Sequence, residues 1–517
     1  MGVSRFGLIL LVGLVVAGAT VGSATFVGSE TGVSLSEQPG NSGANATATV
    51  SSDTLLDPPE DRIGWEGGYW YNESIEVDQS DGLSESELQR YKYRTMARLE
   101  KIRGLEFTDD VEIEFIGPDE VADRIDGNVT QFRGTDQQWE ALFVVGEDRE
   151  ADRVVFETLV GSVVGWAAEE GSETVVLITD DPGEPTAPPT LMAHELAHEL
   201  QHQQFDLDAD RYQRATLDGE NAKDALVEGE ASHLDSVYDQ HCTNGSWDCV
   251  DRGSFATGRS NFVEFGLLPY LRAPYTLGSE YVGRLIDRGG FDAVDGAHRN
   301  PPEYSVTALH GEETEPVRQT GIAPASPLSV PDRSDDNWTR QAAPDRVGAM
   351  GLSVTIGDAA LAWRNGALYP YTNGSADGYV WETHWSNETT AAAFADAYRG
   401  QLSSEGGTQI TDRVWEIQTG TFADAFAVNQ TGNAVRIVNA PSVEALSAVH
   451  GDSEPDTRES ETPTTPATRD ATTDPARTTS SGTTADGDGP GFGIAAALIA
   501  LIAATSAKRK RSSGRDR

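Results

Sequence analysis

The sequence predicts an α+β protein with a mostly helical core, a preceding small α/β region and a separate small C-terminal α+β domain. Three observations indicate this order. Strand-like runs at 111–117 and 174–180 precede a long stretch with helical apolar spacing. Strand-like runs return near the end of the chain, as GYVWETHW and VRIVNA. Between these halves, residues 323–336 are rich in Pro, Ser and Asp, which is typical of a linker.

The N-terminal segment has the pattern of a targeting signal. An apolar run at 6–17 follows Arg5, and small residues stand at 22–24. The run is too short for a comfortable membrane span, so we expect a secretory signal peptide over residues 1–24, with an uncleaved N-terminal anchor as the alternative. Residues 25–57 are rich in Gly, Ser, Thr and Asn and are expected to form a flexible linker.

Capping and helix-breaking residues locate the helices. Ser84 and Glu87 have the spacing of a capping box, which predicts a helix from 84 to about 104. Prolines at 185, 188 and 189 exclude a regular helix before that point but suit the first turn of the next one. The other helices that we expect are at 140–145, 154–168, 220–240, 260–271, 276–288 and 389–400.

The segment PTLMAHELAHELQHQQFDLD contains two overlapping HExxH patterns, HELAH and HELQH. In a helix, residues four apart share a face, so His194 and His198 can bind one zinc ion. Glu195 stands at the same end, where it can hold a water molecule against the metal. His202 is about 12 Å along the axis from His194, too far to share its metal. Geometry alone also allows the pair His198 and His202.

Two glutamates on the next predicted helix compete for the place of a third ligand. Glu228 and Glu230 are two positions apart, so they point about 160° away from each other. Only one of them can face the histidines. Gly229 lies between them, and we expect it to allow close packing of this helix on the histidine helix.

The cysteines and the charge indicate an exported protein. Cys242 and Cys249 are the only cysteines, and they enclose a short loop with the glycosylation sequon Asn244-Gly-Ser, so a local disulfide outside the cell is expected.

The net charge is −45, with 83 acidic against 38 basic residues. Such acidity fits a halophilic surface, because the Debye length is about 3 Å at 1 M salt. It argues against nucleic-acid binding, which needs a basic face.

The C-terminal end has the features of a membrane anchor in order. A Thr-rich stalk, expected to be disordered, precedes Pro490, Gly491 and Phe492. An apolar run to Ala507 follows and is about 25 Å long as a helix, barely enough to cross a bilayer. The basic tail after it should remain cytoplasmic. This arrangement resembles the PGF sorting signal of haloarchaeal surface proteins, which implies cleavage by an archaeosortase-like enzyme and a lipid anchor. An ordinary tail anchor is the alternative.

The histidine segment also carries a family resemblance. HELAHELQHQQFDL resembles the HELxHxLQxQxFDL helix of a group of exported zinc-peptidase-like proteins, in which the first and fifth residues bind the metal. ALVEGEAS at 225–232 resembles their LVEGDA segment and the EGxA segment of gluzincin peptidases. APYTLGSEYV and GGFDAVDGAHRNPP resemble later segments of the group. The similarity covers roughly residues 84–445. The chain departs from it at His202, where relatives carry Asp.

This resemblance implies a ligand set and a mechanism. Zn²⁺ would be bound by His194, His198 and Glu228, and Glu195 would be the catalytic base. The oxyanion donor is undecided among the candidates Tyr275, His310 and His233. The segments implied are 1–24 signal peptide, 25–57 linker, 58–322 zincin-like metallopeptidase region, 323–336 linker, 337–447 small α+β domain, 448–489 disordered stalk and 490–517 sorting signal with hydrophobic helix and basic tail.

The sequence therefore predicts a zinc metallopeptidase that is anchored at the outer face of the cell membrane and cleaves peptide or protein substrates. Two alternatives remain. One is a non-catalytic surface protein that keeps the zinc site or only its helix for stability. The other is an adhesion module on a Thr-rich stalk. Glu195 separates an enzyme from a structural zinc site, because a structural site does not need this carboxylate.

Overall fold

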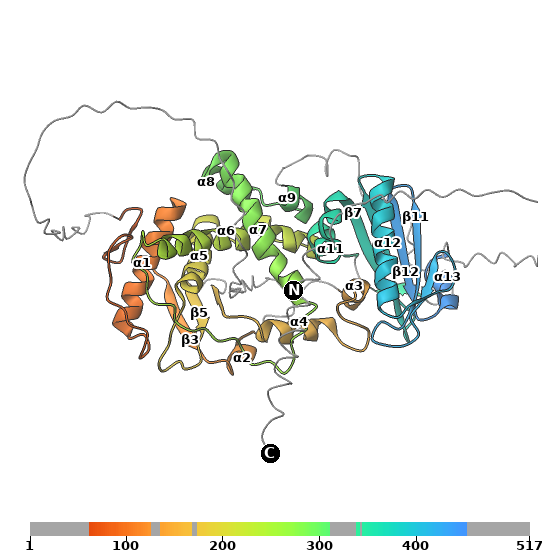
Figure 1. The fold of residues 1–517 in the computed structure, drawn as a ribbon, viewed down its shortest axis with the longest axis horizontal. Coiled ribbons are helices and arrows are strands. Elements are labelled where there is room, and N and C mark those ends of the chain that lie inside the picture. The colour runs from red at the N-terminus through yellow and green to blue at the C-terminus, as the bar shows by residue number, and fades with distance from the viewer. Residues whose placement is uncertain (1–60, 126–134, 168–172, 311–337, 342–343, 452–517) are drawn as a thin grey trace, which may run out of the picture. The chain divides into compact units, whose positions relative to one another are not determined.

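A computed structural model describes residues 61–125, 135–167, 173–310, 338–341 and 344–451 (Figure 1). All of them belong to the first of two compact units, Met1–Asp456. The predicted signal peptide, both linkers and the sorting signal with Pro490, Gly491 and Phe492 lie outside the described residues, as does nearly all of the predicted stalk. Within the described ranges, no helix has the length and apolar character needed to cross a bilayer.

The N-terminal part contains a short hairpin, helices and a three-stranded sheet. Its elements are β1 (Trp65–Glu66), β2 (Tyr69–Trp70), α1 (Glu85–Arg103), β3 (Glu112–Ile116), α2 (Val121–Ile125), α3 (Asp136–Ala141), α4 (Ala151–Val160), β4 (Gly165–Ala167) and β5 (Thr174–Ile178). The sheet order is β3-β5-β4, with β3 parallel and β4 antiparallel to β5. The capping box predicted for α1 is confirmed, and the helix ends at Gly104 with a positive φ of 78°.

Two helices predicted in this part are wrong in their bounds. Of the predicted helix at 140–145, only residues 140 and 141 are helical, and they are the end of α3. Phe143, beyond the end of α3, adopts a left-handed φ of 57°. The predicted helix at 154–168 ends at Val160, and Gly165–Ala167 is the strand β4. The apolar run fits a buried strand as well as a helix, and pairing with β5 decides the outcome.

The middle of the chain is helical. Its elements are α5 (Pro189–Phe205), η2 (Asp210–Tyr212), α6 (Leu217–Thr243), α7 (Leu268–Gly289), α8 (Phe291–Arg299) and α9 (Ser305–His310). The helices predicted at 260–271 and 276–288 are one helix, α7, which begins at Leu268 and continues through Pro274. Packing of α7 along α6 outweighs the backbone hydrogen bond that Pro274 cannot make.

The α6–α7 contact is unusually close at one point. A Cβ atom added to Gly229 of α6 would lie 2.3 Å from the carbonyl carbon of Gly278 in α7. A Cβ atom added to Gly278 would lie 2.5 Å from the Ala225 carbonyl oxygen. The two backbones therefore touch beside Glu228, and any side chain at either glycine would separate them. The expectation that Gly229 packs on the histidine helix is wrong, because Gly229 faces α7 and not α5.

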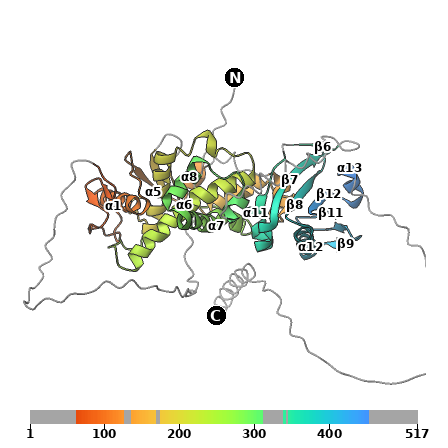
Figure 2. The ribbon, with the colours of Figure 1, turned by 90° about the horizontal axis from the view of Figure 1, so that it is seen from above.

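The C-terminal part is built on a seven-stranded antiparallel sheet of order β6-β7-β8-β12-β11-β10-β9 (Figure 2). Its elements are β6 (Thr339–Arg340), α11 (Gly348–Ile356), η4 (Gly357–Ala362), β7 (Trp363–Thr372), β8 (Asp377–Trp385), α12 (Glu388–Ser404), β9 (Thr408–Gln409), β10 (Val414–Glu416), β11 (Ala425–Thr431), β12 (Ala434–Ala440), η5 (Val443–Ala445) and α13 (Leu446–Val449).

Both faces of this sheet are buried. In β8, Trp381 packs with Phe394 of α12, whereas its neighbour Val380 lies in another apolar cluster with Leu446 of α13. This alternation is the period-two pattern of a strand. The α12-side cluster also includes Trp139 of α3, so the sheet shares apolar core with the N-terminal part. The described residues therefore form a mixed α/β structure with several sheets.

Candidate metal centre

The antiparallel helices α5 and α6 bring two histidines and one glutamate together. His194 and His198 are one turn apart on α5, and their Nε2 atoms are 3.2 Å apart. The Glu228 Oε2 atom on α6 is 3.4 Å from His194 Nε2 and 3.2 Å from His198 Nε2. All three side chains are buried. The three atoms form a nearly equilateral triangle on facing helices.

This triangle fits the requirements of zinc. Ligand atoms at about 2.0–2.1 Å from one tetrahedral zinc lie about 3.3 Å from each other. The three separations of 3.2–3.4 Å match this value. Two imidazoles and one carboxylate are also a donor set that zinc accepts, with a fourth position left for water. The residues present therefore fit the metal.

Further side chains hold the two imidazole rings in place. The Asp235 carboxylate is 2.9 Å from His194 Nδ1, and Gln201 Oε1 is 2.9 Å from His198 Nδ1. In each ring the Nδ1 hydrogen is thereby engaged, which leaves Nε2 as the free lone pair for a metal. Gln201 in turn donates to the Val227 carbonyl oxygen at 3.0 Å.

Glu230 belongs to a different network. Its carboxylate is 2.7 Å from His298 Nε2, pairs with Arg103 and accepts from Gln201 Nε2 at 2.8 Å. The positive Arg103 and the His298 ring lower the pKa of Glu230 despite its burial. Glu230 is therefore an ion-pair partner of Arg103 and His298, and Gln201 links it to His198.

Glu195 is buried next to the triangle without a hydrogen-bond partner. Its side chain has an exposed fraction of 0 %, and neither carboxylate oxygen has a hydrogen-bond partner within the described part of the chain. Burial raises its pKa to about 8, and the neighbouring Glu228 carboxylate adds to the shift while His194 opposes it. A Cβ atom on Gly165 would lie 3.4 Å from Glu195 Oε1, so the edge strand β4 passes beside this carboxylate.

The three candidate oxyanion donors occupy different places. The Tyr275 ring on α7 stacks on His194 with ring centroids 5.9 Å apart, and burial and the Glu228 and Glu195 carboxylates raise its pKa. His233 is half-buried against Phe291. His310 is exposed at the end of α9 and bonds to the Leu361 carbonyl oxygen at 2.8 Å. Of the three, Tyr275 is the residue that the fold brings to the triangle.

His202, the second histidine of HELQH, is not part of this triangle. Its Nε2 atom is buried and without a hydrogen-bond partner in the described ranges, and burial lowers its pKa to about 4. The carboxylate next to the histidine pair is Glu228, whose atoms contact His194 and His198. The geometry therefore assembles the HELAH register.

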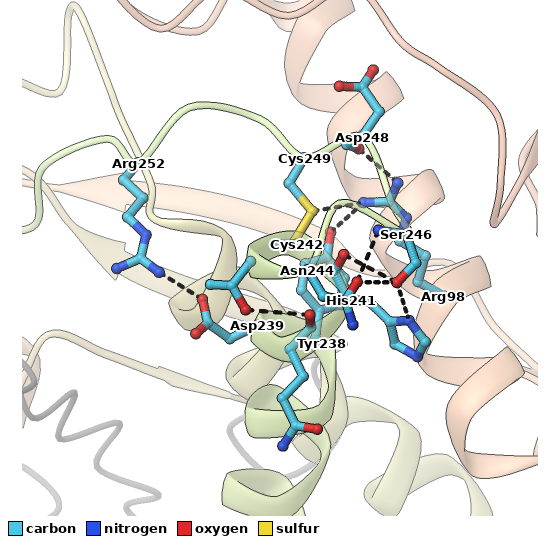
Figure 3. Close-up of a disulfide and its surroundings, with 12 residues drawn as sticks. Arg98, Tyr238, Asp239, His241, Cys242, Asn244, Ser246, Asp248, Cys249 and Arg252 are labelled. Atoms are coloured by element: carbon cyan, nitrogen blue, oxygen red, sulfur yellow. Dashed lines mark hydrogen bonds and ion pairs between the residues drawn. A yellow bond between two sulfur atoms is a disulfide. The ribbon is translucent and has the colours of Figure 1, made fainter. Parts of the chain in front are cut away.

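The predicted disulfide is present at the far end of α6 (Figure 3). Cys242 and Cys249 are joined across a turn. Arg98 of α1 donates to the Tyr238 hydroxyl at 3.1 Å and to the Asp248 carbonyl oxygen at 2.7 Å, as Figure 3 shows. The disulfide loop is thus fastened to α1, which fixes one end of the helix that carries Glu228.

Sequence reasoning missed Asp235 and Gln201, although both had a local signal. Asp235 follows Glu228 by seven residues, two helical turns, and so lies on the same face of α6. Gln201 follows His198 by three residues and is also on its face. The contact between Glu195 and the strand at Gly165 had no such signal, because it depends on the packing of α5 against the sheet.

Comparison with known proteins gave a match that covers the C-terminal part of the chain and not the candidate metal centre. A family model described as "Domain of unknown function (DUF8575)" matches residues 338–450. These residues contain the seven-stranded sheet and its helices, and they exclude α5 and α6. No curated protein and no solved structure matched the chain.

Proposed function

We propose that this protein is an exported, surface-anchored zinc metallopeptidase. The observation that carries the proposal is the combination of two features. Two histidines and a glutamate converge with separations of 3.2–3.4 Å, and a buried carboxylate without a hydrogen-bond partner among the described residues lies beside them. A purely structural zinc site explains the first feature and leaves Glu195 without a role.

Each residue has a separate task in this proposal. His194, His198 and Glu228 would hold the ion, and Asp235 and Gln201 would fix the two imidazoles. Zinc, when bound, supplies a Lewis acid and lowers the pKa of a coordinated water to about 7. The positive charge of a bound zinc ion would oppose the effect of burial and keep Glu195 ionised. Glu195 would then accept the proton of the attacking water and deliver it to the leaving amine.

Tyr275 would be the donor for the substrate oxygen. Its ring is held parallel to His194, and the raised pKa keeps its hydroxyl protonated at neutral pH. A protonated phenol near the ligands can donate a hydrogen bond to the oxygen on which negative charge develops.

The strand β4 favours a peptide as the substrate. It forms an edge of the described three-stranded sheet, and Gly165 at its start is next to Glu195. An extended peptide pairs with the backbone of an edge strand by main-chain hydrogen bonds. A peptide bound to β4 would have its backbone beside the proposed base.

The proposal for the cell surface rests on other features. The disulfide between Cys242 and Cys249 fits an oxidising compartment, and the charge of −45 fits a medium of high salt. The N-terminal signal would direct export, and the C-terminal signal would provide the membrane or lipid anchor. An archaeosortase-like enzyme would be the processing partner. Intact peptides through Arg517 in surface material, found by mass spectrometry, would favour a tail anchor instead.

A second candidate function is a non-catalytic surface or adhesion protein with a structural metal site. The observation in its favour is burial, since His198 and Glu195 are both 0 % exposed. A closed site suits a structural ion better than a substrate.

The experiment that tests the proposal is metal analysis of the purified chain in high salt, combined with a peptide-cleavage assay. We expect about one zinc per chain, loss of cleavage after chelation and recovery when zinc is restored. One bound zinc with no cleavage of any peptide in a complex mixture would favour the structural candidate. Absence of zinc in a folded chain would reject both.

A further inference from the structure

A second group of carboxylates lies far from the histidine helix. The group consists of Glu140 of α3, Glu147 of the loop between α3 and α4, and Asp424 just before β11. Each residue offers one carboxylate oxygen, and these oxygens lie within 4.8 Å of one another. Glu140 and Asp424 are 2 % and 3 % exposed, whereas Glu147 is exposed. The group is therefore buried on one side and open to solvent on the other.

A buried amide points into the same group. Asn439 of β12 is 0 % exposed, and its Nδ2 atom donates to Asp424 Oδ2 at 2.7 Å and to Glu140 Oε1 at 3.3 Å. Its carbonyl oxygen Oδ1 is buried and has no hydrogen-bond partner in the part of the chain that the structure describes. A half-turn of the amide about its Cβ–Cγ bond exchanges the two atoms and directs a fourth oxygen at the carboxylates.

Among the described residues, the strongest charges acting on Glu140 and Asp424 come from carboxylates and not from a basic side chain. The groups that act most strongly on Glu140 are other carboxylates, from Asp424, Glu147 and Asp377. Burial and the Glu147 carboxylate raise the pKa of Asp424 to about 7. Close, buried like charges are unfavourable unless a cation or a proton neutralises them. The group therefore needs one of the two.

Two backbone segments pack closely on each other beside the carboxylate group. A Cβ atom on Gly146 would lie 2.0 Å from the Thr421 carbonyl oxygen, so the loop before Glu147 packs directly on the loop before Asp424. Phe143 has a left-handed φ of 57°, which is costly for a residue with a side chain. Its ring lies 5.4 Å from that of Phe422, centroid to centroid. The packing holds the carboxylates together against their repulsion.

We propose that Glu140, Glu147, Asp424 and Asn439 form a binding site for a hard divalent cation, with calcium as the ion that fits, and that this ion joins the α3–α4 segment to the C-terminal sheet. Calcium binds carboxylate and amide oxygens at 2.3–2.6 Å, so oxygens on one ion lie at most about 5 Å apart. The separations of up to 4.8 Å meet this limit. Water would complete the shell on the open side, next to Glu147.

The test is calcium binding by the full chain, loaded with zinc and kept in constant molar KCl. Free calcium is varied, and binding is followed by equilibrium dialysis and by the thermal unfolding midpoint. We expect a midpoint that rises with calcium. Asp424→Asn and Glu147→Gln should each weaken calcium binding by more than about tenfold, because even an outer-shell partner is worth about 10–100-fold in metal affinity. Glu147 is exposed, so its variant should fold even if a buried variant does not.

A control variant makes the result specific. Asp148→Asn removes a neighbouring exposed carboxylate and should leave the calcium response unchanged. A midpoint that rises equally in the parent chain and in Glu147→Gln would mean general charge screening and would overturn the proposal. A parent chain that ignores calcium but gains stability as the pH falls through about 7 would show that a proton occupies the site instead.

Discussion

Glu228 and Glu230 are two residues apart on α6, and their carboxylates serve separate networks. Glu228 Oε2 lies 3.2 Å from His198 Nε2, whereas Glu230 Oε2 lies 2.7 Å from His298 Nε2. One side of the helix thus completes the triangle with His194 and His198, and the other side closes a buried ion-pair cluster with Arg103. Gln201 joins the two networks, since it contacts both His198 and Glu230.

This separation predicts opposite effects for two neighbouring substitutions. Glu228→Ala should yield a folded chain without zinc, because one of the three proposed metal ligands is lost. Glu230→Ala should still bind zinc, at an affinity reduced by no more than about 10–100-fold through Gln201. It should lose about 1–3 kcal/mol of stability, because His298 and one side of Arg103 lose a buried partner, while Arg103 keeps its pair with Asp295. Zinc content and chemical denaturation measure the two effects.

The result that would contradict this assignment is a reversal between the two variants. A folded, metal-free Glu230→Ala chain together with a zinc-loaded Glu228→Ala chain would assign the ligand to Glu230. It would also reopen the HELQH register, because α6 would then have to dock on α5 at a different rotation.

The glycine contact between α6 and α7 can be tested with a second matched pair of variants. Gly229→Ala places a Cβ atom 2.3 Å from the backbone of Gly278, so the helices must move apart. We expect a loss of about 1–3 kcal/mol. Gly283→Ala is the control, because a Cβ atom there meets nothing within 4 Å. It should stabilise α7 by about 0.5–1 kcal/mol through helix propensity. Equal unfolding midpoints for the two variants would refute the close contact.

Two carboxyls near the N-terminus predict a dependence of stability on pH. Glu100 accepts hydrogen bonds from the Gly64 and Phe107 amides, each at 2.8 Å, and Glu66 lies beside it. Burial and the Glu100 charge raise the pKa of Glu66 from 4.5 to about 9. The folded state therefore holds a proton that the unfolded state releases. Stability from this group is complete below about pH 4.5 and is lost as the pH rises toward 9.

Glu66→Gln tests this dependence. The amide can still donate to Glu100 but cannot ionise, so the variant should lose less stability than the parent chain between neutral and alkaline pH. Glu76→Gln is the control at an exposed position in the same part of the chain and should follow the parent. The measurement is the thermal unfolding midpoint across this range. Parallel curves for Glu66→Gln and the parent would count against the shifted pKa.

The sequence predicted the local features of the candidate site better than the surrounding fold. HExxH spacing singled out His194 and His198, because helix periodicity places them on one face. Periodicity left Glu228 and Glu230 as alternatives, and the resemblance to EGxA segments favoured Glu228. At Gly165–Ala167 the sequence predicts helix where the structure has a strand, since a short apolar run is compatible with both. α7 was divided at Pro274, because the packing on α6 that sustains it is a tertiary effect.

The carboxylate group at Glu140, Glu147 and Asp424 had no sequence signal at all. Its members come from α3, from the loop after it and from the start of β11, and they meet only after the C-terminal sheet has folded against the N-terminal part. Spacing arguments identify residues that are close along one element. They cannot identify a group assembled from segments so far apart in the chain.

The central claim is that Glu195 acts as a base beside a zinc ion bound by the HELAH register. The most direct measurement compares zinc content and peptide hydrolysis in the parent chain, Glu195→Gln and Glu199→Gln. Glu199 is the matched control, because it is a buried glutamate on the same helix and is the corresponding residue of HELQH. We predict full zinc in all three and a loss of hydrolysis, by at least about 10²-fold, in Glu195→Gln alone. A zinc-loaded Glu195→Gln chain that cleaves peptides at the parent rate would contradict the account.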